Sequence, residues 1–534
     1  LKNGLQISDR ELKKGKTQVP AYRAMYLDSQ LKGGDLIKVE KDNAFRALIR
    51  NMQTMEEHKF QIPREQEKIL RGYQKEGFYW IKTLKHNQFG GILADDMGLG
   101  KTLQVITFLW SEFQESAPGE NRRALVITPA SLVFNWMNEI ERFAPGLPAT
   151  VVTGDVKERK ALIKNAGERE VLITSYDLLK RDLKAYQNLD FAVQIIDEAQ
   201  YIKNHGTQVA KAVKEIRSEF RLALTGTPVE NRLSELWSIF DFLMPGFLYS
   251  YEKFRKEIEL PAVQYSNSDA MERLQKMIRP FVLRRLKRDV LKDLPDKLEK
   301  DMFSPLESEQ KELYEAHTER LRLMLGMQSD AEFRTSKLQI LAEITRLRQI
   351  CCYPGLVYEG YKGNSSKLEM CMELVQNAVN GGHKLLLFSQ FTTMLDVLAV
   401  RLKKAKVSFY MLTGSTSKEK RAQMVHAFNE DDTSVFCISL KAGGTGLNLT
   451  AADIVIHYDP WWNLAVQNQA TDRAHRIGQQ NVVSVYRLFM KDTIEERIRA
   501  LQERKRELAD EILSGEGIGQ ALISREEVLE LLGR

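Results

Sequence analysis

Gly100, Lys101 and Thr102 are the residues whose types and spacing point most directly to chemistry. They follow the apolar run "GGILA" and the loop "DDMGLG", and they begin the helical pattern "KTLQVITFLW". Backbone N–H groups of such a loop wrap phosphates, the lysine reaches the β- and γ-phosphates, and the threonine hydroxyl holds Mg²⁺. The predicted contacts to a nucleotide are Asp96, Met97, Gly98, Leu99, Gly100, Lys101 and Thr102.

This nucleotide site departs from the usual loop at one position, because Asp95 stands where the first glycine is expected. A chance Gly-Lys-Thr triplet at a helix start is therefore the alternative interpretation. An acidic pair further along the chain argues against chance.

Asp197 and Glu198 end the apolar run "AVQIIDEAQ". A carboxylate at the end of a buried strand is typical of a Mg²⁺ ligand, and we assign Asp197 together with Thr102 to the metal. Glu198 can then act as the base on an attacking water. Two acids can also simply terminate a strand, but a preceding phosphate loop in the same domain makes that interpretation improbable.

Arg473 and Arg476 lie in "QATDRAHRIGQ" and are spaced to share one helix face. Cations from a neighbouring domain stabilise the charge on a transferring γ-phosphoryl group. We therefore expect ATP to bind in a cleft whose two lobes close for hydrolysis. An ordinary solvated helix would also carry arginines, so this motif alone is weak.

Two series of short β-branched runs alternate with helical patterns, which predicts α/β architecture with two parallel sheets in tandem, each flanked by helices. Charged helical sequence separates the two series and predicts helical projections rather than one long loop. The expected parts are an N-terminal accessory region of unassigned function at 1–65, a first lobe at 66–245, helical protrusions and a linker at 246–345, a second lobe at 346–500 and a C-terminal helical segment at 501–534.

Composition limits the remaining function classes. The net charge of +6 in 534 residues is mild, so it is compatible with nucleic acid without proving it. No apolar run approaches the roughly 18 residues that span a bilayer, so we expect no membrane association. The four cysteines lack the spacing of a zinc site and are predicted to be structural.

Motifs in a fixed order resemble the SWI/SNF family of superfamily-two helicase-like DNA translocases. They include "LRGYQKEGFYW", "DDMGLGKT", "TPASLVFNW", "ITSYDLL", "LTGTPVENRLSELWSI", "LRRLKRDVLKDLPDK", "FSQF", "LTGSTSKEKR" and "SLKAGGTGLNLTAAD". The resemblance covers about residues 66 to 500, and an acid regularly replaces the first loop glycine in this family. It implies two RecA-like lobes that grip double-stranded DNA and step along it during ATP turnover, with ATP and Mg²⁺ as cofactors.

The resemblance also assigns individual residues. Gln74 is the implied contact to adenine, and Gln200, where many relatives have His, is implied to couple the acidic pair to "LTGTP". Hydroxyls and exposed backbone N–H groups suit phosphate contacts without base readout. The implied DNA contacts are Thr128, Ser175, Lys203, Arg421, Lys441, Gly443, Gly444 and Thr445.

The first hypothesis for function is a DNA-stimulated ATPase that translocates on duplex DNA and remodels or displaces DNA-bound proteins. A strand-separating helicase and a non-hydrolysing nucleic-acid-binding scaffold are the alternatives. We expect a monomeric motor. The lack of a recognisable chromatin-reading module favours a prokaryotic protein or an isolated motor core, and Leu rather than Met at residue 1 favours a fragment of a longer protein. A prokaryotic protein would act in the cytoplasm at the nucleoid, and a eukaryotic one in the nucleus.

Overall fold

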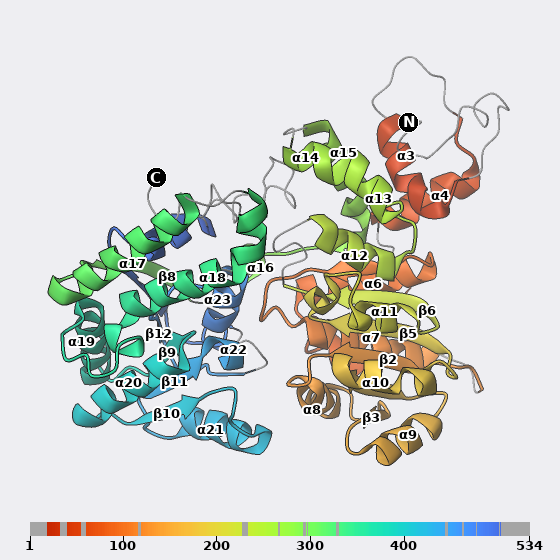
Figure 1. Ribbon diagram of the computed structural model, residues 1–534. Coiled ribbons are helices and arrows are strands. Elements are labelled where there is room, and N and C mark those ends of the chain that lie inside the picture. The colour runs from red at the N-terminus through yellow and green to blue at the C-terminus, as the bar shows by residue number, and fades with distance from the viewer. Residues whose placement is uncertain are drawn as a thin grey trace. The chain divides into compact units, whose positions relative to one another are not determined.

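The computed structural model describes residues 19–31, 40–54, 60–115, 119–226, 233–264, 268–291, 295, 297–326, 330–443, 447–461, 464–476, 478–500 and 502–503. These residues form two compact units, the first within residues 1–291 and the second within residues 292–507. Each unit contains one sheet with helices against its strands (Figure 1).

Seven parallel strands make the sheet of the first unit. Their order is β3-β4-β2-β5-β6-β1-β7. Since all strands run in one direction, the residues that follow them gather at one edge of the sheet. The strands are β1 (Gly91–Leu93), β2 (Ala124–Thr128), β3 (Ala149–Val151), β4 (Val171–Ser175), β5 (Phe191–Asp197), β6 (Ser218–Leu224) and β7 (Val282–Leu283).

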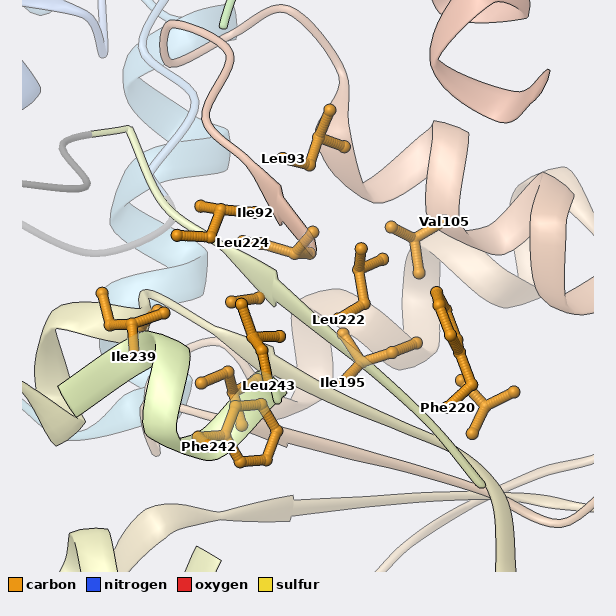
Figure 2. Close-up of a cluster of buried hydrophobic side chains, with 14 of the residues drawn as sticks. Ile92, Leu93, Val105, Ile195, Phe220, Leu222, Leu224, Ile239, Phe242 and Leu243 are labelled. Atoms are coloured by element: carbon orange, nitrogen blue, oxygen red, sulfur yellow. The ribbon is translucent and has the colours of Figure 1, made fainter. Parts of the chain in front are cut away.

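Apolar side chains from the strands and the flanking helices form the core of this unit. Figure 2 shows Ile92 of β1, Ile195 of β5 and Leu222 of β6 gathered with Val105 and Phe242 from two helices. Nearly continuous apolar strands are what a sheet covered on both faces requires. The helices are α6 (Gly72–His86), α7 (Lys101–Glu115), α8 (Val133–Phe143), α9 (Val156–Lys164), α10 (Tyr176–Tyr186), α11 (Gln208–Lys214) and α12 (Leu233–Leu243).

The described N-terminal residues pack on the first unit. Helix α3 contacts α15, and α4 contacts α6 (Figure 1). Arg23 is buried, and its guanidinium donates to the carbonyl of Phe247 and lies over the ring of Tyr249. The remaining helices of this unit are α3 (Ala24–Leu31), α4 (Asn43–Thr54), α5 (Arg64–Glu67), α13 (Tyr251–Phe254), α14 (Leu260–Gln264), α15 (Ser268–Ile278) and α16 (Lys287–Val290), with a π-helical turn at Arg255–Glu259.

The sheet of the second unit has six parallel strands in the order β10-β11-β9-β12-β13-β8. They are β8 (Lys297–Ser304), β9 (Leu385–Ser389), β10 (Phe409–Leu412), β11 (Val435–Ser439), β12 (Ile454–His457) and β13 (Val483–Met490). The helices are α17 (Ser308–Gly326), α18 (Asp330–Cys352), α19 (Ser366–Asn380), α20 (Thr392–Lys404), α21 (Lys418–Glu430), α22 (Leu440–Gly443) and α23 (Leu464–Thr471). The predicted fold class, two parallel sheets flanked by helices, is confirmed.

Two strands lie within the range 246–345, where we expected helical projections and a linker. Strand β7 adds to the first sheet beside β1, and β8 forms an edge of the second sheet beside β13. The sequence of β8 is rich in charged residues and so did not indicate a strand. In the structure Arg487 of β13 pairs with Asp301 at 2.6 Å and with Glu299 at 3.5 Å across the two strands. Opposite charges on paired strands stabilise an edge that is half exposed.

All four cysteines are buried and unbridged, so the prediction of structural cysteines is confirmed. Burial raises the pKa of each thiol, which keeps it protonated. Among the helices of the described residues, none has the length and apolar character to cross a bilayer.

Candidate nucleotide site

The predicted phosphate loop lies between β1 and α7. Gly98 and Gly100 have φ values of 82° and 76°, a left-handed backbone that favours glycine. A Cβ on Gly100 would also lie 2.5 Å from Nε2 of Gln74, so a side chain there would displace the Gln74 amide. The Lys101 ammonium donates to the carbonyl oxygens of Asp95 and Asp96 at 2.5 and 3.3 Å. The two left-handed glycines explain why the loop carries glycine at these positions, and Lys101 is held against the loop backbone.

Gln74 lies against this loop from helix α6. Its Nε2 donates to the carbonyl of Leu99 at 3.0 Å, and the hydroxyl of Tyr73 donates to the same carbonyl at 3.0 Å. Oε1 of Gln74 accepts the N–H of Arg71 at 2.9 Å. The structure therefore brings the residue that we assigned to adenine to the loop that we assigned to phosphate.

Asp197 ends β5 at the same sheet edge, and its hydrogen-bond partners come from β2 and from helices α8 and α10. Trp136 Nε1 donates to Oδ2 of Asp197 at 2.9 Å, and Thr128 Oγ1 donates to the same oxygen at 3.4 Å. The hydroxyl of Tyr176 donates to the backbone carbonyl of Asp197 at 2.7 Å. Burial raises the pKa of Asp197, whereas the Trp136 hydrogen bond and the Lys101 charge oppose that rise.

Glu198 is placed by a left-handed backbone, with φ 52° and ψ 59°. Such a conformation costs about 1–3 kcal/mol in a non-glycine residue and is typical of functional sites. Gln200 Nε2 donates to Oε2 of Glu198 at 2.8 Å, and Thr225 Oγ1 donates to Oε1 of Gln200 at 3.2 Å. Gln200 thus links Glu198 to the "LTGTP" motif, with the amide acting as both donor and acceptor.

The residues at this edge fit Mg²⁺ shared with a nucleotide. Mg²⁺ takes oxygen ligands and is usually bound by one or two carboxylates plus substrate phosphates. A cation beside Asp197 would offset the cost of burying its charge, and Thr102 lies in the first turn of α7, the helix that follows the loop. In the part of the chain that the structure describes, no three His, Cys, Asp or Glu side chains gather into a metal site of their own.

Trp136 and Tyr176 are functional candidates that the sequence patterns did not reveal. Both lie in motifs that carry the family resemblance, "TPASLVFNW" and "ITSYDLL", but spacing alone gives no sign that either side chain reaches Asp197. The signal that could have found them is their position in the helices that follow β2 and β4, because β2 pairs with both β4 and β5 in the first sheet.

Arg473 and Arg476 belong to the second unit. The prediction that they share one helix face is wrong, because α23 ends at Thr471. Residues 472–476 form turns and bends instead, in which the N–H of Arg473 bonds to the carbonyl of Ala470, three residues back. Tertiary contacts override the helix here: Leu449 N–H donates to the Arg473 carbonyl at 3.1 Å, and His475 Nε2 bonds the Pro295 carbonyl at 2.9 Å.

The expected DNA contacts divide by their surroundings. Thr128, which we expected to contact DNA, is fully buried. Its hydroxyl donates a hydrogen bond to Asp197 instead of lying at the surface. Ser175 caps α10 by accepting the N–H of Leu178, and Lys203, 40% exposed, pairs with Glu235 at 3.8 Å. Arg421 lies in α21 and Lys441 and Gly443 in α22, while Gly444 and Thr445 fall outside the described residues.

Protein-family models match three parts of the chain. Residues 73–356 match the SNF2-related domain, residues 366–478 the helicase conserved C-terminal domain, and residues 1–63 a domain described as bacterial SNF2 helicase associated. The first of these matches covers more than half of the chain.

Curated relatives resemble the chain as well. An "Uncharacterized ATP-dependent helicase" of Mycoplasma pneumoniae is 40% identical over 487 residues, which are 90% of this chain and 46% of the relative. The "Putative ATP-dependent helicase/translocase YwqA" of Bacillus subtilis is 40% identical over 501 residues, 90% of this chain and 53% of the relative. The chain thus spans about half the length of the curated relatives it matches.

Among solved structures, a "Sulfolobus solfataricus SWI2/SNF2 ATPase core in complex with dsDNA" is 38% identical, with 84% of this chain and 93% of that chain covered and a TM-score of 0.42. The match to the SNF2-related model agrees with the motif order and with the site at the edge of the first sheet. The chain belongs to the SNF2-related family of helicase-type proteins.

Proposed function

We propose that the protein hydrolyses ATP to ADP and phosphate and uses the energy to translocate on double-stranded DNA. The observation that carries this proposal is the meeting of Lys101, Asp197 and Glu198 at one edge of the first sheet, with Gln200 bonded to Glu198. The family supports it, since curated bacterial relatives are named ATP-dependent helicases.

Each residue has a distinct part in the proposed hydrolysis. The loop N–H groups and Lys101 bind the β- and γ-phosphates, and Gln74 faces the base. Thr102 and Asp197 would hold Mg²⁺, which neutralises phosphate charge when bound. Glu198 accepts a proton from water as the water oxygen bonds to the γ-phosphorus, and the bond from that phosphorus to the bridging oxygen of ADP breaks.

The second unit completes the reaction in this proposal. Arg473 and Arg476 stabilise the charge that develops on the transferring phosphoryl group, as cations supplied from another domain do in related NTPases. Hydrolysis then depends on both units, which makes a domain movement part of each turnover.

Double-stranded DNA is the proposed track, bound through its backbone without sequence readout. The family resemblance supports this assignment, and so does the Bacillus relative, which is named a putative helicase/translocase. DNA-bound proteins are the proposed substrates of remodelling by a monomeric motor. The match of residues 1–63 to a bacterial domain supports action in a prokaryotic cytoplasm, at the nucleoid.

The test is the rate of phosphate release with double-stranded DNA, single-stranded DNA, RNA or no nucleic acid. We expect duplex DNA to stimulate the rate most, and stimulation by RNA alone would contradict the DNA assignment. Displacement of a third strand from a DNA triplex then measures translocation. A forked duplex separates the translocase from a strand-separating helicase, because only the helicase releases single strands from it.

A further inference from the structure

Asp95, the acid in place of the first loop glycine, is fully buried and paired with Arg285. The Arg285 guanidinium donates to Oδ1 of Asp95 at 2.9 Å and to Oδ2 at 2.5 Å, a two-point contact that fixes both groups. Gln104 of α7 joins them, with Nε2 donating to Asp95 at 3.2 Å and Oε1 accepting from Arg285 at 2.8 Å. Arg285 belongs to the "LRRLKRDV" motif, to which the proposed hydrolysis assigns no role.

Backbone bonds also join the phosphate loop to residues 283–287, which we name the coupling segment. Ala94 N–H donates to the Leu283 carbonyl at 2.7 Å, and Asp96 N–H donates to the Arg285 carbonyl at 3.0 Å. The N–H of Lys287 donates to the Asp96 carboxylate at 3.0 Å. The first half of the loop is thus bonded to the coupling segment. This segment ends at Lys287, five residues before the second unit begins at Lys292.

The same part of the loop positions the phosphate-binding lysine. The Lys101 ammonium donates to the carbonyls of Asp95 and Asp96. The coupling segment binds the same two residues: it contacts both side chains and accepts the N–H of Asp96. A shift of the coupling segment would therefore move the groups that locate Lys101.

Helix α6 leaves room for this arrangement at Gly77. A Cβ on Gly77 would lie 1.9 Å from Oε1 of Gln104 and 2.9 Å from Nη2 of Arg285, so a side chain would displace both. Arg285 also donates to the carbonyl of Tyr73, next to Gln74, and lies over the Tyr73 ring. The network thus reaches both the predicted adenine contact and the phosphate loop.

We propose that Asp95 and Arg285 are positioning residues that make nucleotide affinity depend on the coupling segment. This inference rests on the proposed function, because it takes the loop to bind ATP and ADP. The pair touches no phosphate itself and acts through the carbonyls that locate Lys101. The acid at position 95 is then a working part of the site rather than a neutral replacement for glycine.

Binding of a fluorescent ADP analogue to the whole chain, measured by titration, tests the inference. Asp95→Asn and Arg285→Gln are each expected to weaken ADP binding about tenfold, the effect of losing charge-assisted hydrogen bonds. Each single variant is also expected to melt at a lower temperature, because it leaves one buried charge unpaired. The double variant D95N/R285Q removes both charges, so its melting temperature is expected to recover while its ADP binding stays weak.

Arg288→Gln is the matched control, since its side chain is 79% exposed, lies next to the coupling segment and pairs with Asp289. This variant is expected to bind ADP as the wild type does. Recovery of ADP affinity together with melting temperature in the double variant would show a purely structural pair and overturn the inference alone. A wild-type chain that binds no ADP would overturn the proposed function and this inference with it.

Discussion

At the scale of single residues, the protein itself orients the carboxylate that we assign to Mg²⁺. The indole N–H of Trp136 reaches Asp197 Oδ2, and the Asp197 backbone carbonyl accepts the hydroxyl of Tyr176. These donors lie in the two motifs in which the DNA contacts Thr128 and Ser175 were expected, so a change there can reach the proposed metal ligand through one hydrogen bond. Single substitutions can separate this positioning from binding and from proton transfer.

Trp136→Phe removes one hydrogen bond from Asp197 and keeps most of the aromatic packing. A lost hydrogen bond to a charged group is worth about 1.5–3 kcal/mol, so we expect kcat to fall about tenfold or more. The Mg²⁺ concentration for half-maximal ATPase rate is expected to rise as well. Trp110→Phe, in α7 of the same unit, is the control, and an equal effect of both substitutions would contradict a specific role for Trp136.

Glu198→Gln keeps the size of the side chain but removes the proposed base. ATP and DNA binding are expected to persist, while turnover falls by about 10²–10⁴-fold, the contribution typical of general base catalysis. Equilibrium binding of a fluorescent ATP analogue and the rate of phosphate release measure the two effects separately. Normal hydrolysis by this variant would show that the base assignment is wrong.

At the scale of elements, strand β12 and helix α23 are joined by a buried histidine in the second unit. His457 Nε2 and Thr471 Oγ1 are 2.8 Å apart, and Thr471 Oγ1 donates to the Gln467 carbonyl, so the neutral ring donates from Nε2. Burial is the main cause that lowers the pKa of His457 to about 3. This contact holds Thr471, the last residue of α23, which is two residues before Arg473.

His457 makes the stability of this unit sensitive to acid. The unfolded chain takes up a proton near pH 6.5 and the folded chain only near pH 3, so stability is lost as pH falls between these values. From pH 6.5 to 4.5 the loss from this group is about 2–3 kcal/mol. Urea unfolding at pH 7.5 and 4.5 measures it, and His457→Gln is expected to lose less stability on acidification than the wild type.

His426→Gln is the control for this experiment, because His426 is 73% exposed and lies in α21 of the same unit. We expect it to lose as much stability on acidification as the wild type does. If His457→Gln behaved in the same way, the acid sensitivity would come from other groups.

Another contact between elements is the fully buried ion pair of Lys367 in α19 and Glu495, which lies near the end of the described chain, at 2.7 Å. Although burial opposes its charge, Glu495 raises the pKa of Lys367. Glu495→Gln leaves a buried ammonium without its counter-ion, so we expect a loss of about 3–5 kcal/mol in the free energy of unfolding. The double variant K367M/E495Q removes both charges and is expected to recover part of this loss, as measured by chemical denaturation.

At the scale of the whole molecule, the proposed reaction divides its residues between two units. The first unit carries the loop and the acidic pair, and the second carries Arg473 and Arg476. A divided site predicts that nucleotide binding and hydrolysis can be separated by substitution in the second unit alone.

Arg476→Ala is therefore expected to keep nucleotide binding and lose about 10³-fold or more in turnover, the effect of removing a cation supplied to the transferring phosphoryl group. Titration with a fluorescent ATP analogue and phosphate release with duplex DNA measure the two properties. Arg401→Ala, on α20 of the same unit, is the control with an unchanged rate. If Arg476→Ala lost nucleotide binding, the arginine would bind ATP before the reaction rather than stabilise the transferring phosphoryl group.

Local sequence determined much of the architecture. Strands β1 to β6 and β9 to β13 could be predicted from their apolar runs, because strands covered on both faces are nearly continuously apolar. The proposed phosphate loop could be predicted too, because Gly98 and Gly100 have a left-handed backbone that few other residues adopt. The link from Glu198 through Gln200 to Thr225 agrees with what the family resemblance implied for Gln200, since an amide can both donate and accept hydrogen bonds.

Tertiary structure decided the features that depend on residues far apart in the chain. Strand β8 is charged and became a strand only through pairing with β13, and α23 ends before Arg473 because turns held by Leu449 and Pro295 replace the helix. The burial of Thr128 and the reach of Trp136 to Asp197 likewise depend on which strands are neighbours. Asp95 shows the difference most clearly: its type is visible at once in the sequence, but its partner Arg285 stands 190 residues later, and only the fold brings the two charges together.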